Sequence, residues 1–198
     1  HARNGSAARN PPGQPQAIKH EVDREGRLVN DLLDSARLEA GKFEPHNKDM
    51  EAVELCRRLI ERFKPLAQSK GIQLALDYPE APISMFSDAN SIELILGNLL
   101  ANAIKFTNEG NVELGCMARD TEIEFSVQDT GSGMSAEQSA HLFEKYYTAG
   151  KPGGTGLGLV IAKMTADALQ GTLNVQGILG QGTCFTLVLP RYLNKDTI

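Results

Sequence analysis

The sequence contains no tryptophan and only three cysteines, Cys56, Cys116 and Cys184, among 198 residues. The cysteines are odd in number, lie far apart and form no CxxC pair, which argues against a disulfide framework and against a zinc site. A reducing cytosol suits such a chain. The length allows one main core with an appendage and is too short for two full domains.

Long hydrophobic runs and clusters of one charge are also missing. The apolar stretch 92–100 is interrupted by Glu93, Gly97 and Asn98. No segment approaches the roughly 20 apolar residues of a membrane span. Lys and Arg number 20 against 25 Asp and Glu, for a net charge of -5, and no basic stripe is present. We therefore expect no nucleic acid among the partners and no membrane contact by this chain.

The N-terminal part is composed differently from the rest. Residues 1–15 are rich in Gly, Pro, Ser and Asn and predict a flexible linker or a tag remnant. Over residues 16–40, apolar side chains recur at helical spacing and Gly41 supplies a stop. This pattern predicts a long amphipathic helix, which must bury its apolar stripe against a partner helix.

The remaining chain alternates helical and strand patterns. We predict helices over 51–70, 89–106, 135–145 and 155–169, and strands over 72–76, 112–117, 122–128, 172–176 and 183–189. Strands come in adjacent pairs as well as between helices, which favours a mixed β-sheet with helices on one face over a doubly wound parallel sheet. The predicted fold class is an α/β two-layer sandwich.

Residues 153–159 read GGTGLGL and carry four glycines in seven positions. The spacing matches neither a P-loop nor the dinucleotide fingerprint, because Leu159 stands where the third glycine of that fingerprint belongs. A glycine-rich turn before a helix exposes backbone N–H groups and the positive end of the helix dipole, which suit a phosphate. A simple tight turn is the alternative.

Asn98, Asn102 and Lys105 share one side of an otherwise apolar helix. The two carboxamides either bridge neighbouring backbone or offer oxygen ligands to Mg²⁺, with Lys105 neutralising a phosphate. The segment DTGSGM, residues 129–134, follows a strand and is either a plain turn or a base-binding site. A carboxylate only accepts hydrogen bonds, so Asp129 would pair with the exocyclic amine of adenine and select ATP over GTP. Thr183, in the turn GQGT, would lie near Asp129 if their two strands are neighbours.

Five segments in this order resemble the motifs of bacterial sensor histidine kinases. NLLANAIKFT, DTGSGM, LFEKYY, GGTGLGL and GQGT are similar to the N box, the first glycine box, the F box, and the second and third glycine boxes of that family. RLVNDLLDSARLEAGKFE resembles the second helix of the family's dimerisation and phosphotransfer domain. The resemblance implies the GHKL ATPase fold, a mixed sheet backed by three helices, with ATP held beneath a lid. It divides the chain into a partial phosphotransfer helix over 16–43, an ATP-binding catalytic domain over 44–191 and a tail over 192–198.

The same resemblance assigns roles to matching residues. Asn98 and Asn102 would serve Mg²⁺ and the phosphates, Lys105 would bind a phosphate, and Asn98 and Lys105 would act in catalysis. Asp129 would bind adenine, and Phe143 and Tyr147 would form the lid and its base. The remaining nucleotide contacts would come from Gly131, Gly133, Gly154, Thr155, Gly156, Leu157, Gly158 and Thr183.

One position separates the branches of the GHKL superfamily. Its type II topoisomerases and heat-shock chaperones carry a Glu general base four residues before the Mg²⁺-binding Asn, and here that position is Asn98, which cannot take a proton. The site therefore suits transfer of the γ-phosphoryl group to another acceptor, with slow hydrolysis.

The phosphoacceptor histidine of the family has no clear counterpart. The histidines are His1, His20, His46 and His141, and none lies on a first hairpin helix, so autophosphorylation of this chain alone is not expected. One hypothesis is a histidine kinase catalytic domain that phosphorylates a hairpin of the same or a partner chain and then a response regulator receiver domain. The resemblance implies a homodimer in the full-length protein and a cytoplasmic location, as the cytoplasmic part of a membrane-bound sensor or otherwise. The alternative is a kinase-inactive nucleotide-binding module that pairs with another kinase.

Overall fold

The computed structural model describes residues 33, 36, 38–148 and 155–192. They form, in chain order, β1 (Lys48–Glu51), α2 (Ala52–Ser69), β2 (Gln73–Asp77), β3 (Ser84–Ser87), α3 (Ala89–Phe106), β4 (Asn111–Ala118), β5 (Glu122–Asp129), α4 (Ala136–His141), α5 (Gly158–Ala168), β6 (Thr172–Ile178) and β7 (Gly182–Pro190). The predicted linker, most of the helix expected over 16–40 and most of the tail lie outside the described residues; positions 33, 36, 38 and 39 are helical.

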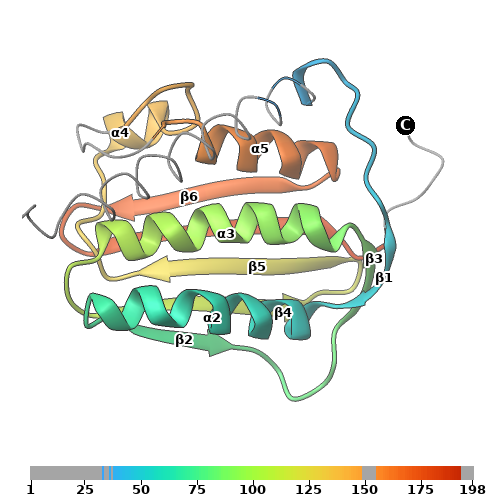
Figure 1. Ribbon diagram of the computed structural model, residues 1–198, viewed down its shortest axis with the longest axis horizontal. Helices are drawn as coiled ribbons and strands as arrows, with labels where there is room; N and C mark the ends of the chain where they lie inside the picture. The colour runs from blue at the N-terminus through green and yellow to red at the C-terminus, as the bar shows by residue number, and fades with distance from the viewer. Residues whose placement is uncertain (1–32, 34–35, 37, 149–154, 193–198) are drawn as a thin grey trace, which may run out of the picture.

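The main sheet has five strands in the order β2-β4-β5-β7-β6. β2 runs parallel to β4 and the other neighbours are antiparallel, so the sheet is mixed. Figure 1 shows α2, α3 and α5 side by side over one face of this sheet. Along β5, Ile123, Phe125 and Val127 are buried and alternate with more exposed residues, as a strand with one covered face requires. The predicted two-layer sandwich with three helices on one face is confirmed.

The helix α3 forms the centre of the core. Its apolar residues recur three and four positions apart and are almost fully buried: Ile92, Ile95, Leu96, Leu99, Leu100, Ala103 and Ile104. Burying a large aliphatic side chain contributes roughly 1.5–3 kcal/mol, so this row is a main source of stability. The row also fixes the rotation of α3 and therefore the direction in which its polar residues point. None of the described helices is long and apolar enough to cross a membrane.

A second sheet of two strands, β1 and β3, was not predicted. The strands are four residues each and pair antiparallel, with Glu51 opposite Ser84. The Glu51 carboxylate caps α2 by accepting from the backbone N–H of Val53 at 3.1 Å, and it also accepts from the N–H of Ile83 at 2.8 Å. Such short strands carry too little periodicity to be recognised without their partner.

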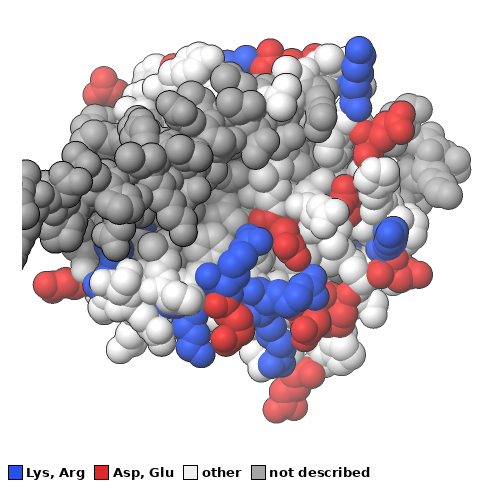
Figure 2. All heavy atoms as spheres, in the orientation of Figure 1, with Lys and Arg blue, Asp and Glu red and all other residues white. Residues whose placement is uncertain are grey.

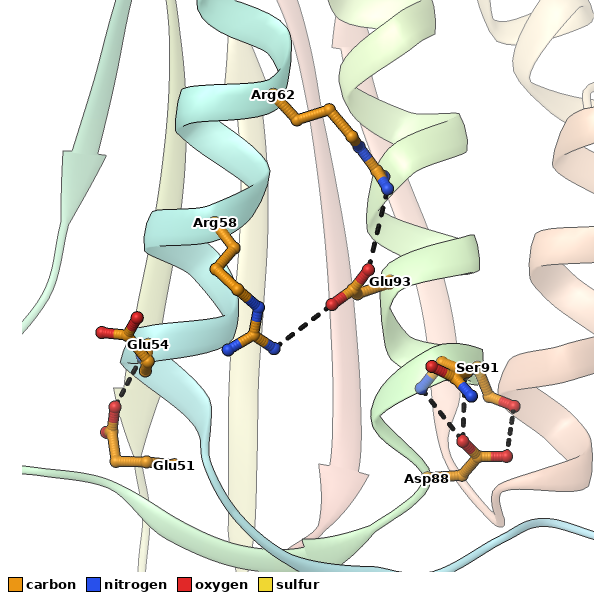
Figure 3. A network of polar contacts seen from close by, with 8 residues as sticks. Glu51, Glu54, Arg58, Arg62, Asp88, Ser91 and Glu93 are labelled. Carbon is orange, nitrogen blue, oxygen red and sulfur yellow. Dashed lines mark hydrogen bonds and ion pairs between the residues drawn. The ribbon is translucent and has the colours of Figure 1, made fainter.

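Polar contacts at the starts of α2 and α3 hold the two helices in place (Figure 3). Asp88 caps α3, accepting from the backbone N–H of Asn90 at 3.0 Å and from the Ser91 hydroxyl at 2.9 Å. Glu93 of α3 bridges to Arg58 at 3.2 Å and to Arg62 at 3.6 Å on α2. Figure 2 shows Lys and Arg side chains interspersed with Asp and Glu side chains over α2 and α3. Exposed pairs of this kind contribute little each, so the caps matter more than the ion pairs.

Candidate functional site

The polar face of α3 meets the N-terminus of α5. Asn98 and Asn102 are half-buried on α3. The Asn98 side-chain N–H donates to the Leu94 carbonyl at 3.0 Å, which leaves its Oδ1 facing away from its own helix. A Cβ built on Gly158 would lie 2.7 Å from that Oδ1, so the first residue of α5 packs directly on Asn98. The structure thus brings together the carboxamide face and the second glycine segment.

The start of α5 differs from the starts of the other helices. Glu51, Asp88 and Ser135 cap α2, α3 and α4 with their side chains, whereas no side chain of a described residue caps α5. The helix was expected from Thr155 and begins instead at Gly158, because the Thr155 hydroxyl accepts from the Leu157 N–H at 3.2 Å and folds residues 155–157 into a turn. An uncapped helix N-terminus presents backbone N–H groups and a positive partial charge to an anion.

Lys105 lies in the last turn of α3 and is half-buried. Its Nζ is 5.4 Å from the centre of the Phe106 ring. A cation at the C-terminal end of a helix interacts favourably with the helix dipole, which supports its place here. Since α3 is helical over Ala89–Phe106, its period places Lys105 on the same side as Asn98 and Asn102.

Asp129 is the last residue of β5 and only 4% exposed. Its Oδ1 accepts from the Gly131 N–H at 2.8 Å, and Asp129 is paired in register with Thr183 of β7. Burial raises the pKa of Asp129, and the backbone N–H groups of Gly131 and Thr183 oppose that rise by stabilising the ionised form. The strands of Asp129 and Thr183 are therefore neighbours, and Thr183 lies near Asp129 as the sequence predicted for that case.

The loop after Asp129 lies between the end of α3 and the hairpin of β6 and β7 and is hydrogen-bonded to both. The Ser132 N–H donates to the Phe106 carbonyl at 3.4 Å, and the Ser132 carbonyl accepts from Gly180 at 2.8 Å. A Cβ on Gly131 would lie 2.6 Å from the Phe106 carbonyl oxygen, and one on Gly133 would overlap the Ile178 carbonyl. The loop conformation is thus tied to the C-terminal end of α3.

The segment after α4 carries the predicted lid residues. The short helix is six residues long rather than extending to residue 145 as predicted, because the chain continues from Leu142 in turns. Phe143 packs against the core, and the half-buried Tyr147 has its ring centre 6.1 Å from that of His141. The Tyr146 N–H donates to the Gly156 carbonyl at 3.1 Å, which ties residue 146 to the turn before α5. Gly154 lies outside the described residues.

His141 offers a test of this segment by pH titration. A hydrogen bond to Glu144 at 2.7 Å and the charge of that carboxylate raise the pKa of His141 above its ordinary value of 6.5. The contact is fully present below pH 6.5 and is lost as the pH rises through the raised pKa. We expect an NMR titration midpoint above 6.5, and a lower midpoint in Glu144→Gln. Glu137→Gln serves as the control with a smaller effect, and a wild-type midpoint at or below 6.5 would contradict the contact.

One cavity borders the site without containing all of it. A cavity of about 460 Å³ is lined by Asp129 and Thr183 together with Gln128, Gln176 and Cys184. Gln128, Gln176 and Cys184 each follow or precede a residue that faces the core. Since side chains alternate along a strand, these three lie on the sheet face away from the helices. Asn98, Asn102 and Lys105 are not among the lining residues, so this cavity is distinct from the space between α3 and α5.

Sequence reasoning missed one group that contacts this region. The Lys70 ammonium, directly after α2, donates to the Ile104 carbonyl at 2.5 Å and to the Thr107 carbonyl at 2.7 Å at the end of α3. No motif marks this lysine, because its partners are backbone atoms of residues more than 30 positions away. Only the parallel course of α2 and α3 reveals the contact.

Residues 87–193 match the sequence profile of a family described as "Histidine kinase-, DNA gyrase B-, and HSP90-like ATPase". Among curated proteins, the chain is 34% identical over 187 residues to "Sensor protein GacS" of Pseudomonas syringae pv. syringae, covering 88% of this chain and 21% of the relative. It is 34% identical over 181 residues to "Sensor histidine kinase RppB" of Synechocystis, covering 86% of this chain and 40% of that relative. The chain thus spans less than half the length of these relatives.

Solved structures with the same fold include "Crystal structure of ShkA full-length in complex with AMPPNP". The TM-score is 0.82 at 35% identity, covering 88% of this chain and 37% of that chain. A second neighbour, "Acinetobacter baumannii histidine kinase AdeS", has a TM-score of 0.79 at 20% identity, covering 93% of this chain and 87% of that chain, and shows the fold alone.

Proposed function

This chain belongs to the family of histidine kinase-, DNA gyrase B- and HSP90-like ATPases, and we propose that it acts as the ATP-binding catalytic domain of a two-component sensor histidine kinase. The observation that carries the proposal is the meeting of Asn98 on α3 with the uncapped N-terminus of α5. A carboxamide oxygen and the backbone N–H groups of the first turn of α5 face the same space, which is the chemistry that a metal-bound phosphate chain needs. The neighbour solved with AMPPNP is consistent with ATP as the ligand.

The site has a phosphate end and a base end. At the phosphate end, we assign Lys105, the turn 154–157 and Gly158 to the phosphates, and Asn98 and Asn102 to Mg²⁺. Their side-chain oxygens fit a hard cation, which when bound would neutralise charge on the phosphate oxygens.

At the base end, we assign Asp129 to the adenine amine. The residues that support it or complete the pocket are Gly131, Gly133, Phe143, Tyr147 and Thr183. The burial of Asp129 supports this assignment, because a carboxylate away from water forms stronger hydrogen bonds and discriminates more sharply between bases.

The residue at position 98 favours transfer to a side chain over hydrolysis. An asparagine cannot remove a proton from water, so the site lacks a general base where the hydrolytic branch has Glu. In the proposed reaction, a histidine ring nitrogen bonds to the γ-phosphorus, the bond from that phosphorus to the β–γ bridging oxygen breaks, and ADP leaves with the electron pair. The chain's own residues orient the triphosphate and hold its charge, which is most of the work in phosphoryl transfer.

The acceptor and the partners belong to the proposal as well. His46 lies in the connector, where its backbone N–H donates to the Asp88 carboxylate at 3.1 Å, and His141 is the last residue of the six-residue helix α4, so neither is on a helical hairpin. His1 and His20 lie outside the described residues. We assign the acceptor to a hairpin of the same or a partner chain in a homodimeric protein, with a response regulator receiver domain as the next acceptor. The proposed division is a linker over 1–15, a partial phosphotransfer helix over 16–43, a catalytic domain over 44–191 and a tail over 192–198, in a cytoplasmic setting.

Calorimetry followed by phosphoryl transfer tests this function. We expect ATP to bind more tightly than GTP and more tightly with Mg²⁺ than without, and γ-labelled ATP to label a supplied hairpin that carries the acceptor histidine. Asn102→Ala should lower transfer about tenfold or more, because a charge-assisted contact is removed. Asn90→Ala, on the exposed first turn of the same helix, is the matched control.

The outcomes separate the candidate functions. If ATP binds but no hairpin is ever labelled, the chain is the kinase-inactive module that pairs with another kinase. If neither nucleotide binds, both candidates fail.

A further inference from the structure

The C-terminal end of α3 receives an ammonium group from α2. The last four carbonyls of a helix have no partner within the helix and need donors from elsewhere. Lys70 Nζ donates to the Ile104 carbonyl at 2.5 Å, to the Lys105 carbonyl at 3.2 Å and to the Thr107 carbonyl at 2.7 Å. It therefore supplies two of the four missing partners and one carbonyl beyond the helix.

Hydrogen bonds from Thr107 and Ser132 satisfy the remaining carbonyls of the same turn. Thr107 donates its N–H at 3.0 Å and its hydroxyl at 2.7 Å to the Ala103 carbonyl. The Phe106 carbonyl accepts from Ser132 in the loop after Asp129. All four terminal carbonyls are thus satisfied, and Lys70 is the one charged donor among the described partners.

The location of Lys70 explains how it reaches this turn. Figure 1 shows α2 and α3 running in the same direction and ending at the same side of the molecule, where β5 also ends. Lys70 follows α2 directly, and its own backbone N–H closes that helix on the Ala67 carbonyl at 3.1 Å. The lysine backbone is therefore fixed by one helix while its ammonium lies at the negative end of the dipole of the other.

We propose that Lys70 is a positioning residue of the nucleotide site. It holds the last turn of α3, which carries Lys105 and, one turn earlier, Asn102. Through the Phe106 carbonyl, that turn also holds Ser132 and with it the loop that contacts Asp129. In this way Lys70 connects the phosphate end of the site to the base end through hydrogen bonds, without itself contacting the nucleotide. The inference rests on the proposed function of this site.

Neutral and charged replacements of Lys70 separate positioning from general stability. We expect Lys70→Met to weaken ATP binding about tenfold or more, because a turn displaced by even a fraction of an ångström misplaces Lys105 and the loop. Lys70→Arg keeps the cation and its donors and should restore most of the affinity. Lys64→Met removes a lysine that pairs with Glu61 on the exposed side of α2, and should bind ATP as the wild type does.

A stability control and an NMR readout complete the experiment. Glu51→Ala removes the cap at the other end of α2 and should lower the melting temperature without a matching loss of affinity. The amide signals of Ser132 and Thr107 should shift in Lys70→Met and not in Glu51→Ala. If Lys70→Met does not fold, the comparison of Lys70→Gln with Lys70→Arg carries the same test.

The result that overturns the inference is specific. Folded Lys70→Met that binds ATP within twofold of the wild type, or Glu51→Ala that loses as much affinity for the same loss of stability, removes the positioning role. Failure of the proposed function looks different, because the wild type itself would then bind no ATP. In that case the Ser132 and Thr107 signals alone decide whether Lys70 holds the turn.

Discussion

Asp129→Asn is expected to lose ATP affinity on the order of a hundredfold, because an acceptor facing the adenine amine is replaced in part by a donor in a buried place. Asp129 is only 4% exposed, so bulk water replaces its contact with the base poorly. The carboxamide can instead donate to the carbonyl oxygen of guanine, so the ratio of GTP to ATP affinity should rise. Calorimetry with both nucleotides measures the two effects.

The fold should tolerate this substitution. Burial raises the pKa of Asp129, so its ionised form is disfavoured in the folded state, and that part of the stability falls as the pH rises from the unfolded pKa through the folded one. Removing the charge therefore costs little at neutral pH, and the Asn oxygen can still accept from Gly131. Asp120→Asn, in the exposed turn between β4 and β5, is the matched control. Equal ATP affinity in Asp129→Asn and the wild type would show that the base lies elsewhere.

Gly182→Ala is expected to destabilise the fold by about 3 kcal/mol or more, since it combines a left-handed backbone with a steric collision. Gly182 has φ +96, and a Cβ there would lie 1.9 Å from the Asp129 carbonyl oxygen and 3.0 Å from the Thr130 Cα. Backbone atoms of a paired strand cannot move aside cheaply. The strand end that carries Asp129 would have to shift, so ATP binding should fall together with stability.

Gly180 in the same hairpin provides the matched control. Its φ is +76, but a Cβ there would meet nothing within 4 Å. Gly180→Ala should therefore lower the unfolding free energy by only about 1 kcal/mol, the cost of a left-handed backbone for a residue with a side chain. Urea unfolding of the two variants separates the collision from the backbone term. Equal losses of unfolding free energy would mean that the close approach of Gly182 to Asp129 is absent.

The helices with a clear apolar period were predictable almost to the residue. The helix predicted over 89–106 is α3, and the one predicted over 51–70 is α2. Both begin after a capping carboxylate and have strong apolar spacing, so their signals are local. α5 was predicted three residues too early, because the Thr155 hydroxyl competes with the helix for the Leu157 N–H.

Features that depend on distant partners were not predictable in the same way. The strands β1 and β3 are stabilised by each other, and a four-residue strand has no pattern of its own. The contact of Lys70 with α3 joins positions 34 to 37 residues apart through backbone oxygens. Backbone acceptors are the same at every residue, so nothing in the sequence identifies them.

By itself the sequence determined the kinds and order of the helices and of the strands of the main sheet, the amide face of α3, the glycine turns and the family, since periodicity and motif spacing are properties of neighbouring residues. Only the tertiary structure decided that Thr183 lies opposite Asp129, that Gly158 packs on Asn98 and that Lys70 closes α3. These contacts follow from sheet register and helix packing, which depend on the summed burial of the whole core rather than on any local run of residues.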